Sequence, residues 1–252
     1  MKMKSMAFTD TVTGHELLAP VGSFESLQAA IRAGAHAVYF GVEQLNMRAK
    51  SINSFAVEDL GEIAETCRQN AIRTNITLNT VMYDHDLQLV KRILKEAKSA
   101  GIDAVIAADF AVLELCRQMK MPVHISTQAN ISNIESVRFF SAFADVVVLA
   151  RELTLGQIAA IKKDIQRKDI RGVSGELMRI EVFVHGALCM AISGKCYLSL
   201  HTHHASANRG ACTQNCRRPY IVTDKESGHQ LEIDNEYIMS PKDLCTIEVL
   251  DQ

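Results

Sequence analysis

The chain has 252 residues and a net charge of −2, and 48% of its residues are hydrophobic. This length supplies the core of one large domain or two small ones, and the near-zero charge argues against a surface that is basic throughout. No apolar run approaches the roughly 18–20 residues of a membrane-spanning helix, and the first residues lack the apolar stretch of a signal peptide. We therefore expect a cytoplasmic protein with reduced thiols and no membrane partner.

Short β-branched, apolar runs alternate with amphipathic helical patterns in chain order. The predicted strands are 15–21, 37–42, 73–80, 104–109, 122–128, 146–151, 180–186 and 236–240. The predicted helices are 23–35, 57–70, 85–101, 110–119, 133–144 and 154–167, and another begins at 241. The first helix carries the clearest end signals, with Ser23 as its N-cap and Gly34 near its end. Because no strand alternates clearly between polar and apolar residues, we expect a parallel sheet covered by helices.

Eight strands with helical crossovers predict an α/β fold that closes into an eightfold β/α barrel of the TIM type. A doubly wound open sheet is the alternative, but no GxGxxG follows the first strand, which weakens a dinucleotide-binding fold. We expect one barrel domain over 1–252, with a cysteine-rich insertion at 187–235 between strands seven and eight. Its tract YIVTDKESGHQLEID predicts a hairpin that turns at 226–228. An insertion after strand seven lies at the C-terminal rim, where the catalytic loops of such barrels lie.

Most of the cysteines gather in the last quarter of the chain. They are Cys189, Cys196, Cys212, Cys216 and Cys245. Only Cys212 and Cys216 have the short spacing of a zinc ribbon, whereas the wider spacing of Cys189 and Cys196 suits a cluster with ligands from several loops. We expect Cys189, Cys196, Cys212 and Cys245 to hold zinc or an iron–sulfur cluster, with Cys216 as the alternate ligand.

The other cysteines and a histidine tract have simpler interpretations. Cys67 and Cys116 fall on amphipathic helical patterns, where a cysteine is usually a buried thiol. The tract LHTHHAS contains His201, His203 and His204, which look like metal ligands. A short histidine tract in a loop is more often solvated surface, and we expect that here.

Strand seven carries the candidate catalytic pair. Alternation along EVFVHG places Glu181 and His185 on the same side of the strand. A carboxylate and an imidazole that face the barrel interior together can exchange protons with a substrate. The alternative is a buried, hydrogen-bonded pair without chemistry.

Polar residues near the C-terminal ends of the predicted strands and within the insertion suggest a polar, anionic or nucleobase-like ligand. The candidate substrate-binding residues are Arg48, Asn79, Gln128, Arg151, Arg217 and Arg218. Lys195 and Arg209 add to the positive charge of the insertion. Such a group of cations holds phosphate or is ordinary solvated charge.

Nearly the whole chain resembles peptidase family U32, the collagenase-like peptidases. The resemblance rests on ELLAPVGSFESLQAAIRAGAHAVYFG, HISTQANISN, VVVLARELTL, EVFVHGALCMAISGKC, GACTQNCRRPY and MSPKDLC. Better-understood members of this family resemble iron–sulfur hydroxylation proteins, in which four cysteines hold a 4Fe–4S cluster. The resemblance implies that Cys189, Cys196, Cys212 and Cys245 do so here.

The form GACTQNCRRPY is most similar to the RNA-modifying branch of the family. Some members of that branch form 5-hydroxyuridine at the tRNA wobble position, with prephenate as a proposed oxygen source, and others hydroxylate a cytidine of 23S ribosomal RNA. A shorter pair of members acts in ubiquinone synthesis and has different cysteine spacing. Full-length relatives usually continue past position 252, so we expect this chain to be the N-terminal part of a longer protein.

These observations predict an iron–sulfur enzyme that hydroxylates a pyrimidine in tRNA or rRNA, most specifically the tRNA wobble uridine. The first alternative is a collagenase-like peptidase, although the sequence contains neither HExxH nor GxSxG. The second alternative is a non-catalytic, zinc-stabilised module that binds RNA. Iron in the purified protein would favour the first prediction, and zinc would favour the second alternative.

Overall fold

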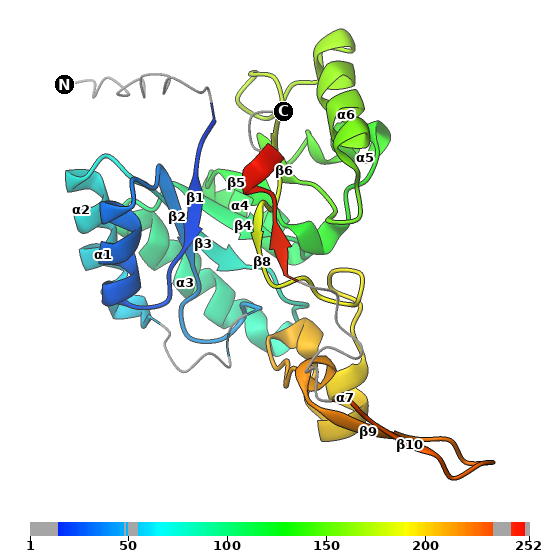
Figure 1. Ribbon diagram of the computed structural model, residues 1–252. Coiled ribbons are helices and arrows are strands. Elements are labelled where there is room, and N and C mark those ends of the chain that lie inside the picture. The colour runs from blue at the N-terminus through cyan, green and yellow to red at the C-terminus, as the bar shows by residue number, and fades with distance from the viewer. Residues whose placement is uncertain (1–14, 48, 50–54, 234–242, 250–252) are drawn as a thin grey trace, which may run out of the picture.

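The computed structural model describes residues 15–47, 49, 55–233 and 243–249 (Figure 1). Its centre is a parallel sheet of seven strands, whose order in the sheet follows the order in the chain. The strands are β1 (Leu18–Pro20), β2 (Ala37–Phe40), β3 (Arg73–Leu78), β4 (Ala104–Ala107), β5 (Val123–Ile125), β6 (Val146–Val148) and β7 (Arg179–Glu181). The expected α/β class and parallel sheet are confirmed.

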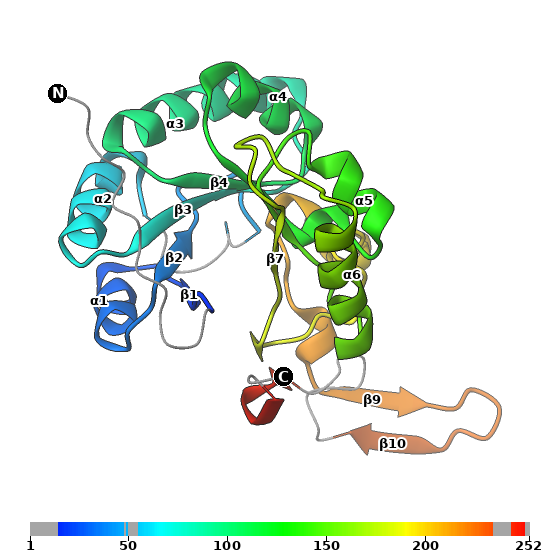
Figure 2. The same ribbon diagram turned by 90° about the horizontal axis from the view of Figure 1, so that it is seen from above.

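Helices connect these strands and cover the outer face of the curled sheet (Figure 2). They are α1 (Phe24–Arg32), α2 (Leu60–Gln69), α3 (Leu87–Ala100), α4 (Phe110–Met119), α5 (Ile134–Phe140) and α6 (Leu155–Arg167). The predicted ends of α1 are confirmed, because Ser23 caps it by accepting a hydrogen bond from the Ser26 N–H and Gly34 follows it with a φ of +78°.

The outer face of the sheet is the apolar core. The strand register places Ile76, Val105, Ile125 and Val147 on this face, and all four are fully buried. Helix residues such as Ile93 complete the same hydrophobic cluster. Burial of this apolar surface is the main stabilising term for the sheet and its helices.

The inner, concave face of the sheet is different, because alternate strands place polar side chains on it. The residues concerned are Arg73, Asn75 and Thr77 on β3, His124 on β5, and Arg179 and Glu181 on β7. The strands between them contribute apolar residues, such as Ile106 and Val146. The interior of a closed barrel is usually packed with branched apolar side chains, so the concave face of this sheet is unusually polar.

The sheet is curled like half of a TIM barrel, as Figure 2 shows. Within the described residues, the edge strands β1 and β7 do not pair with each other. The expected eighth strand, 236–240, lies outside the described residues. Closure of the barrel therefore stays a prediction.

Two expectations near the end of the chain are corrected. The strand predicted at 180–186 is broken, because β7 ends at Glu181 and His185–Gly186 form a separate strand, β8. β8 pairs antiparallel with β11 (Leu244–Cys245), and the Thr246 N–H donates to the Val184 carbonyl at 2.9 Å. This pairing places β11 and a 3-10 helix at Ile247–Val249 where an α-helix was expected.

The remaining elements are α7 (Leu198–His203) and a hairpin of β9 (Tyr220–Thr223) and β10 (Gln230–Ile233). The hairpin confirms the predicted strands and turn, with Gly228 at a φ of +73°. It extends away from the sheet in both ribbon views (Figures 1 and 2).

Candidate functional site

The C-terminal ends of the strands form a polar rim. Asn79, which follows β3, accepts a hydrogen bond from the Met47 N–H (3.2 Å) through Oδ1. Its Nδ2 donates to the Ser126 hydroxyl (3.3 Å), which follows β5. Asn79 therefore connects the loops after β2 and β5 at the face where barrel enzymes bind substrates.

Residues 187–218, which we call the cysteine segment, lie over this rim. Arg151 donates through Nη2 to the Ser193 hydroxyl (2.9 Å) and to the Ala191 carbonyl (3.3 Å). Asn130 donates to the Ser193 carbonyl at 2.8 Å. A Cβ at Gly194 would lie only 2.9 Å from Gln128 Oε1. The loops after β5 and β6 thus anchor the first part of the segment.

A second anchor lies further along the segment. Arg209 forms an ion pair with Asp86, at the start of α3, with Nη1 2.7 Å from Oδ2. The Arg209 side chain was expected to be a solvated or phosphate-binding cation. The guanidinium instead neutralises the carboxylate of Asp86, which is almost fully buried.

Two of the clustered cysteines influence a third, Cys216. The pKa of the half-buried Cys216 thiol is raised, first by burial and then by the neighbouring Cys189 and Cys212 thiolates, while the nearby Arg217 opposes this shift. Within the described residues, no three metal-ligand side chains lie close enough to hold a metal ion as placed. Soft thiolates that lie near one another nevertheless suit zinc or an iron–sulfur cluster.

The other two candidate ligands lie in different surroundings. The Cys196 N–H donates to the Asn208 side chain at 3.2 Å, which fixes its backbone within the segment. Cys245 is exposed on β11, where it pairs with His185 of β8. The structure thus places the expected alternate ligand, Cys216, near Cys189 and Cys212.

The expected Glu181–His185 pair is not formed. Glu181 Oε2 lies 3.5 Å from Nδ1 of His124, and both side chains are largely buried on the concave face. His185 is exposed on β8, because the strand that was expected to align it with Glu181 ends before it. Sequence analysis missed His124, although an imidazole in the middle of an otherwise apolar strand was a usable signal.

The remaining candidate substrate-binding residues differ in whether their side chains already form hydrogen bonds within the protein. Arg217 donates to the Leu188 carbonyl (3.1 Å) and to Asp243 (3.2 Å). Arg218 is exposed. Arg48 lies outside the described residues. The guanidinium of Arg217 therefore serves partly to fold the segment around Cys189 and Cys216.

Some polar atoms beneath the segment have no partner in the described part of the chain. They are Gln128 Oε1, Asn130 Oδ1 and Arg151 Nε, and all three are buried. The orientation of the Asn130 amide is fixed, because its Nδ2 donates to the carbonyls of Gln128 and Ser193. Two acceptors and one donor are thus available at the rim for a water molecule or a polar ligand.

The interpretations of the remaining cysteines and histidines are confirmed. Cys67 and Cys116 are fully buried, and burial raises the pKa of their thiols to about 11 and about 12. His201, His203 and His204 are exposed at the end of α7.

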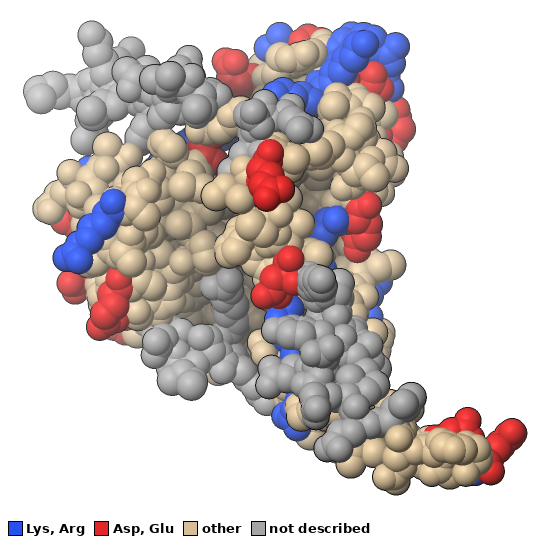
Figure 3. All heavy atoms as spheres, in the orientation of Figure 1, with Lys and Arg blue, Asp and Glu red and all other residues tan. Residues whose placement is uncertain are grey.

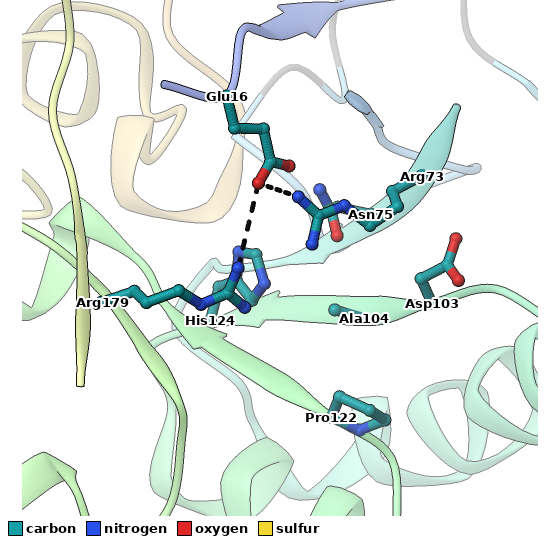
Figure 4. A pocket seen from close by; sticks show the side chains of 8 residues that line it. All are labelled: Glu16, Arg73, Asn75, Asp103, Ala104, Pro122, His124 and Arg179. Carbon is teal, nitrogen blue, oxygen red and sulfur yellow. Dashed lines mark hydrogen bonds and ion pairs between the residues drawn. The ribbon is translucent and has the colours of Figure 1, made fainter. Parts of the chain in front are cut away.

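A cavity of about 130 Å³ lies at the opposite, N-terminal end of the strands (Figure 4). Glu16 reaches into it, forms an ion pair with Arg73, and lies 3.9 Å from the guanidinium of Arg179. His124 lines the same cavity from β5. Because Glu16 precedes β1 and Arg179 lies on β7, these contacts join the two edges of the sheet. This end of a barrel usually serves stability rather than catalysis.

The face of the molecule in Figure 3 carries both signs of charge, and acidic side chains gather at the tip of the β9–β10 hairpin. This distribution agrees with the near-zero net charge. In the described residues, no helix combines the length and the apolar character that crossing a bilayer requires.

Comparison with known proteins places these features in a family. The model of peptidase family U32 matches residues 22–252. A collagenase of Porphyromonas gingivalis is 56% identical over 241 residues, which cover 96% of this chain and 58% of that protein. The 23S rRNA 5-hydroxycytidine synthase of Escherichia coli is 36% identical over 92% of this chain and 34% of that protein. The tRNA hydroxylation protein P1 of Bacillus subtilis is 34% identical over 92% of this chain and 54% of that protein.

The solved structure of the U32 peptidase Mk0906 has the same fold, with a TM-score of 0.54 over 74% of this chain and 75% of that one, at 12% identity. The chain spans between 34% and 58% of the length of the three curated relatives. The family match over residues 22–252 and the identity to these relatives show that the chain belongs to peptidase family U32.

Proposed function

We propose that the protein hydroxylates a pyrimidine in RNA with the help of an iron–sulfur cluster, and that its substrate is the tRNA wobble uridine. The observation that carries this proposal is the cysteine segment, which polar contacts hold at the C-terminal rim and in which Cys189 and Cys212 lie near enough to Cys216 to raise the pKa of its thiol. Two relatives that are 34% and 36% identical are named for the hydroxylation of tRNA and 23S rRNA, which supports an RNA substrate.

The ligand set follows from the thiols. Cys189, Cys212 and Cys216 would hold the 4Fe–4S cluster, with a fourth ligand from Cys196 or Cys245. A bound cluster would supply the electron transfer that oxygen insertion requires, and prephenate is the candidate oxygen donor. Zinc fits the same thiolates and is the alternative that metal analysis decides.

The residues around the segment would bind the RNA and move protons. Gln128 and Arg151 present unpartnered buried polar atoms that can hydrogen-bond the edge of a base. Arg218 is exposed and available to a phosphate. Glu181, at the C-terminal end of β7, is the candidate to accept the proton leaving the base, and His124, which also lines the N-terminal cavity, would orient its carboxylate.

A peptidase is the second candidate function, because the collagenase of Porphyromonas gingivalis is 56% identical. Nucleophilic cysteines are activated by a lowered pKa, which a neighbouring cation or base provides. The pKa of the Cys216 thiol is raised rather than lowered. This direction argues against Cys216 as the nucleophile of a peptidase.

The test combines metal analysis with nucleoside analysis. We expect the anaerobically purified protein to contain iron and sulfide and to show the broad visible absorbance of a cluster. Total tRNA from a deletion strain is then examined by nucleoside mass spectrometry, after complementation with the wild type, with Cys216→Ala or with Cys67→Ala. Cys67 lies on the buried face of α2 and serves as the matched control.

The wild type and Cys67→Ala should restore 5-hydroxyuridine, whereas Cys216→Ala should not. Stoichiometric zinc without iron, or unchanged nucleosides in the deletion strain, would rule the proposal out. Cleavage of gelatin by the purified protein that is lost in Cys216→Ala would favour the peptidase.

A further inference from the structure

The cysteine segment is attached to the loop after β3 by residues that lie between Cys196 and Cys212. The Asn208 carbonyl accepts a hydrogen bond from the Val81 N–H at 3.1 Å. The Asn208 side-chain oxygen accepts a second one from the Cys196 N–H at 3.2 Å. Asn208 thus connects the backbone of a candidate metal ligand to the loop after β3.

Arg209 makes the central contact of this attachment. Its Nη1 and Nη2 donate to the two carboxylate oxygens of Asp86 at 2.7 and 3.2 Å. Nη1 also donates to the Val81 carbonyl (2.9 Å), and the guanidinium lies 4.0 Å from the centre of the Tyr83 ring. A bidentate ion pair stacked on an aromatic ring is among the stronger polar contacts a protein makes.

The Arg209–Asp86 pair is largely shielded from water. The Asp86 side chain is 8% exposed and the Arg209 side chain 23%. The hydrogen bond from Arg209 lowers the pKa of Asp86, and the carboxylate raises the pKa of Arg209 in return. Removal of either partner would leave the other as an uncompensated, mostly buried charge, which is strongly unfavourable.

Gly210 completes the attachment through the backbone. Its φ is +81°, and a Cβ there would lie 2.2 Å from the Asn46 carbonyl oxygen. The backbone of the segment therefore lies directly against the loop after β2. We call Asn208–Gly210, together with Asp86 and Tyr83, the latch.

Apolar contacts cannot replace the latch, because the cysteine segment buries almost no hydrophobic side chains. Residues 187–218 are all described, and Ala207 is their single buried hydrophobic side chain. The segment therefore stays on the rim through polar contacts, and the latch has the largest number of them around one side chain, Arg209.

We propose that Arg209 and Asp86 are positioning residues, which hold Cys196 and Cys212 at the rim before any metal binds. This inference rests on the proposed function only for which metal or cluster the thiols bind. Pre-ordering of the ligands means that metal binding does not have to supply the free energy of ordering the segment, so it raises metal affinity.

The test uses three variants of the whole protein. Asp86→Asn removes the charge but keeps a side-chain oxygen that can still accept the hydrogen bond from the Tyr83 N–H. Arg209→Lys keeps the charge but loses the bidentate geometry and the stacking on Tyr83. Asp169→Asn is the matched control, because it breaks an ion pair of similar length, to Arg171 at 2.8 Å, on the exposed surface.

The first measurement needs neither metal nor RNA. Reduced, metal-free protein is treated with iodoacetamide, and alkylation of each cysteine is followed by peptide mass spectrometry. We expect Asp86→Asn to speed up alkylation of the half-buried Cys196 roughly tenfold, because the segment leaves the rim more often. Arg209→Lys should give a smaller increase, and Asp169→Asn should match the wild type.

The second measurement is a titration with Co²⁺, whose thiolate complexes absorb visible light. We expect the Co²⁺ affinity of Asp86→Asn to fall about tenfold or more, as for other residues that orient metal ligands. Wild-type values of both alkylation rate and Co²⁺ affinity in Asp86→Asn would overturn the proposal. Equal acceleration at the core cysteines Cys67 and Cys116 would also overturn it, because it would show a general loss of fold.

The two proposals fail independently. If nucleoside analysis shows no RNA hydroxylation while alkylation of Cys196 still responds to Asp86→Asn, the proposed function fails and the latch stands. If RNA is hydroxylated by Asp86→Asn at the wild-type level and neither measurement changes, the latch fails alone.

Discussion

The sheet with its helices and the part of the chain that follows Glu181 are stabilised in different ways. From β1 to β7, each strand and helix contributes apolar side chains to one cluster, with residues such as Ile93 fully buried. After Glu181, Ala207 is the only buried hydrophobic among the residues whose side chains the structure describes. The other buried side chains there are polar: Ser193, Ser199 and Asn215.

The difference indicates where a metal would matter. A segment that buries little apolar surface gains little from the hydrophobic effect, so its order depends on hydrogen bonds, ion pairs or a bound group. Metal binding commonly adds to the folding free energy of cysteine-rich segments, and here it would add to the stabilisation that the latch already provides. Large apolar side chains also stay exposed in this region, for example Ile192 and Tyr197. We therefore expect metal removal to loosen the cysteine segment and to leave the sheet intact.

Thiol labelling should show the largest contrast between the two regions. Burial raises the pKa of Cys116 to about 12, whereas an ordinary cysteine titrates at about 8.5. At pH 8 the thiolate fraction of Cys116 is thus on the order of a thousand times lower than that of an ordinary cysteine. We expect a thiolate-specific reagent to label the exposed Cys189 and Cys212 far faster than Cys116, as measured by peptide mass spectrometry.

The pH dependence of that labelling gives an internal control. Because pH 8 lies far below the pKa of Cys116, each unit increase in pH should raise its thiolate fraction about tenfold until the pKa is approached. Labelling of Cys116 in native buffer at the rate of Cys189 would mean that α4 does not pack against the sheet as described.

Truncation of one isoleucine in each region should give the next largest difference, measured as the change in the free energy of unfolding. Ile93 on α3 is fully buried, whereas the Ile192 side chain in the cysteine segment is 55% exposed. We expect Ile93→Ala to lower the free energy of unfolding by about 2–5 kcal/mol, because it leaves a cavity in the core. Ile192→Ala should change it by less than about 0.5 kcal/mol. Urea unfolding followed by circular dichroism measures both, and equal losses would contradict the contrast.

The sheet could be predicted from the sequence because its information is local. Apolar runs between amphipathic helices gave the parallel order, and Ser23 and Gly34 marked the ends of α1. The strand at 180–186 was predicted too long, because nothing local shows that His185 pairs with Cys245, sixty residues further on. The pairing of two short strands that lie far apart in the sequence, such as β8 and β11, depends on tertiary contacts, and sequence periodicity does not reveal these.

The site could be predicted only in part, for a related reason. Composition and spacing identified the cysteines, but which of them come together depends on how the segment folds back, and nothing local shows that Cys216 lies near Cys189 and Cys212. The partner of Glu181 was wrong because strand alternation does not show which residue lies across the sheet, and His124 lies there. The latch was missed because Arg209 and Asp86 are more than a hundred residues apart, and an isolated arginine in a loop looks like solvated charge.

Alanine substitution of two glycines in the C-terminal region should give the smallest of these differences, seen in how firmly the cysteine segment is attached to the rim. Gly210 and Gly228 both have a positive φ, so alanine at either position costs about 1 kcal/mol in backbone strain. At Gly228 a Cβ meets no atom within 4 Å, whereas at Gly210 it would lie 2.2 Å from a backbone oxygen that no side-chain rotation can move. We expect Gly210→Ala to weaken attachment of the cysteine segment by about 1–3 kcal/mol beyond that strain, the range for overpacking a close contact.

Limited proteolysis measures this difference, because cleavage within residues 187–218 reports how often the segment leaves the rim. Gly210→Ala should be cleaved there faster than Gly228→Ala, while urea unfolding of the sheet stays the same in both variants. If the two variants are cleaved in this range at equal rates, the segment does not lie against Asn46 and its order must come from elsewhere. If Gly210→Ala also destabilises the sheet, the two regions fold as one unit and the distinction between them fails.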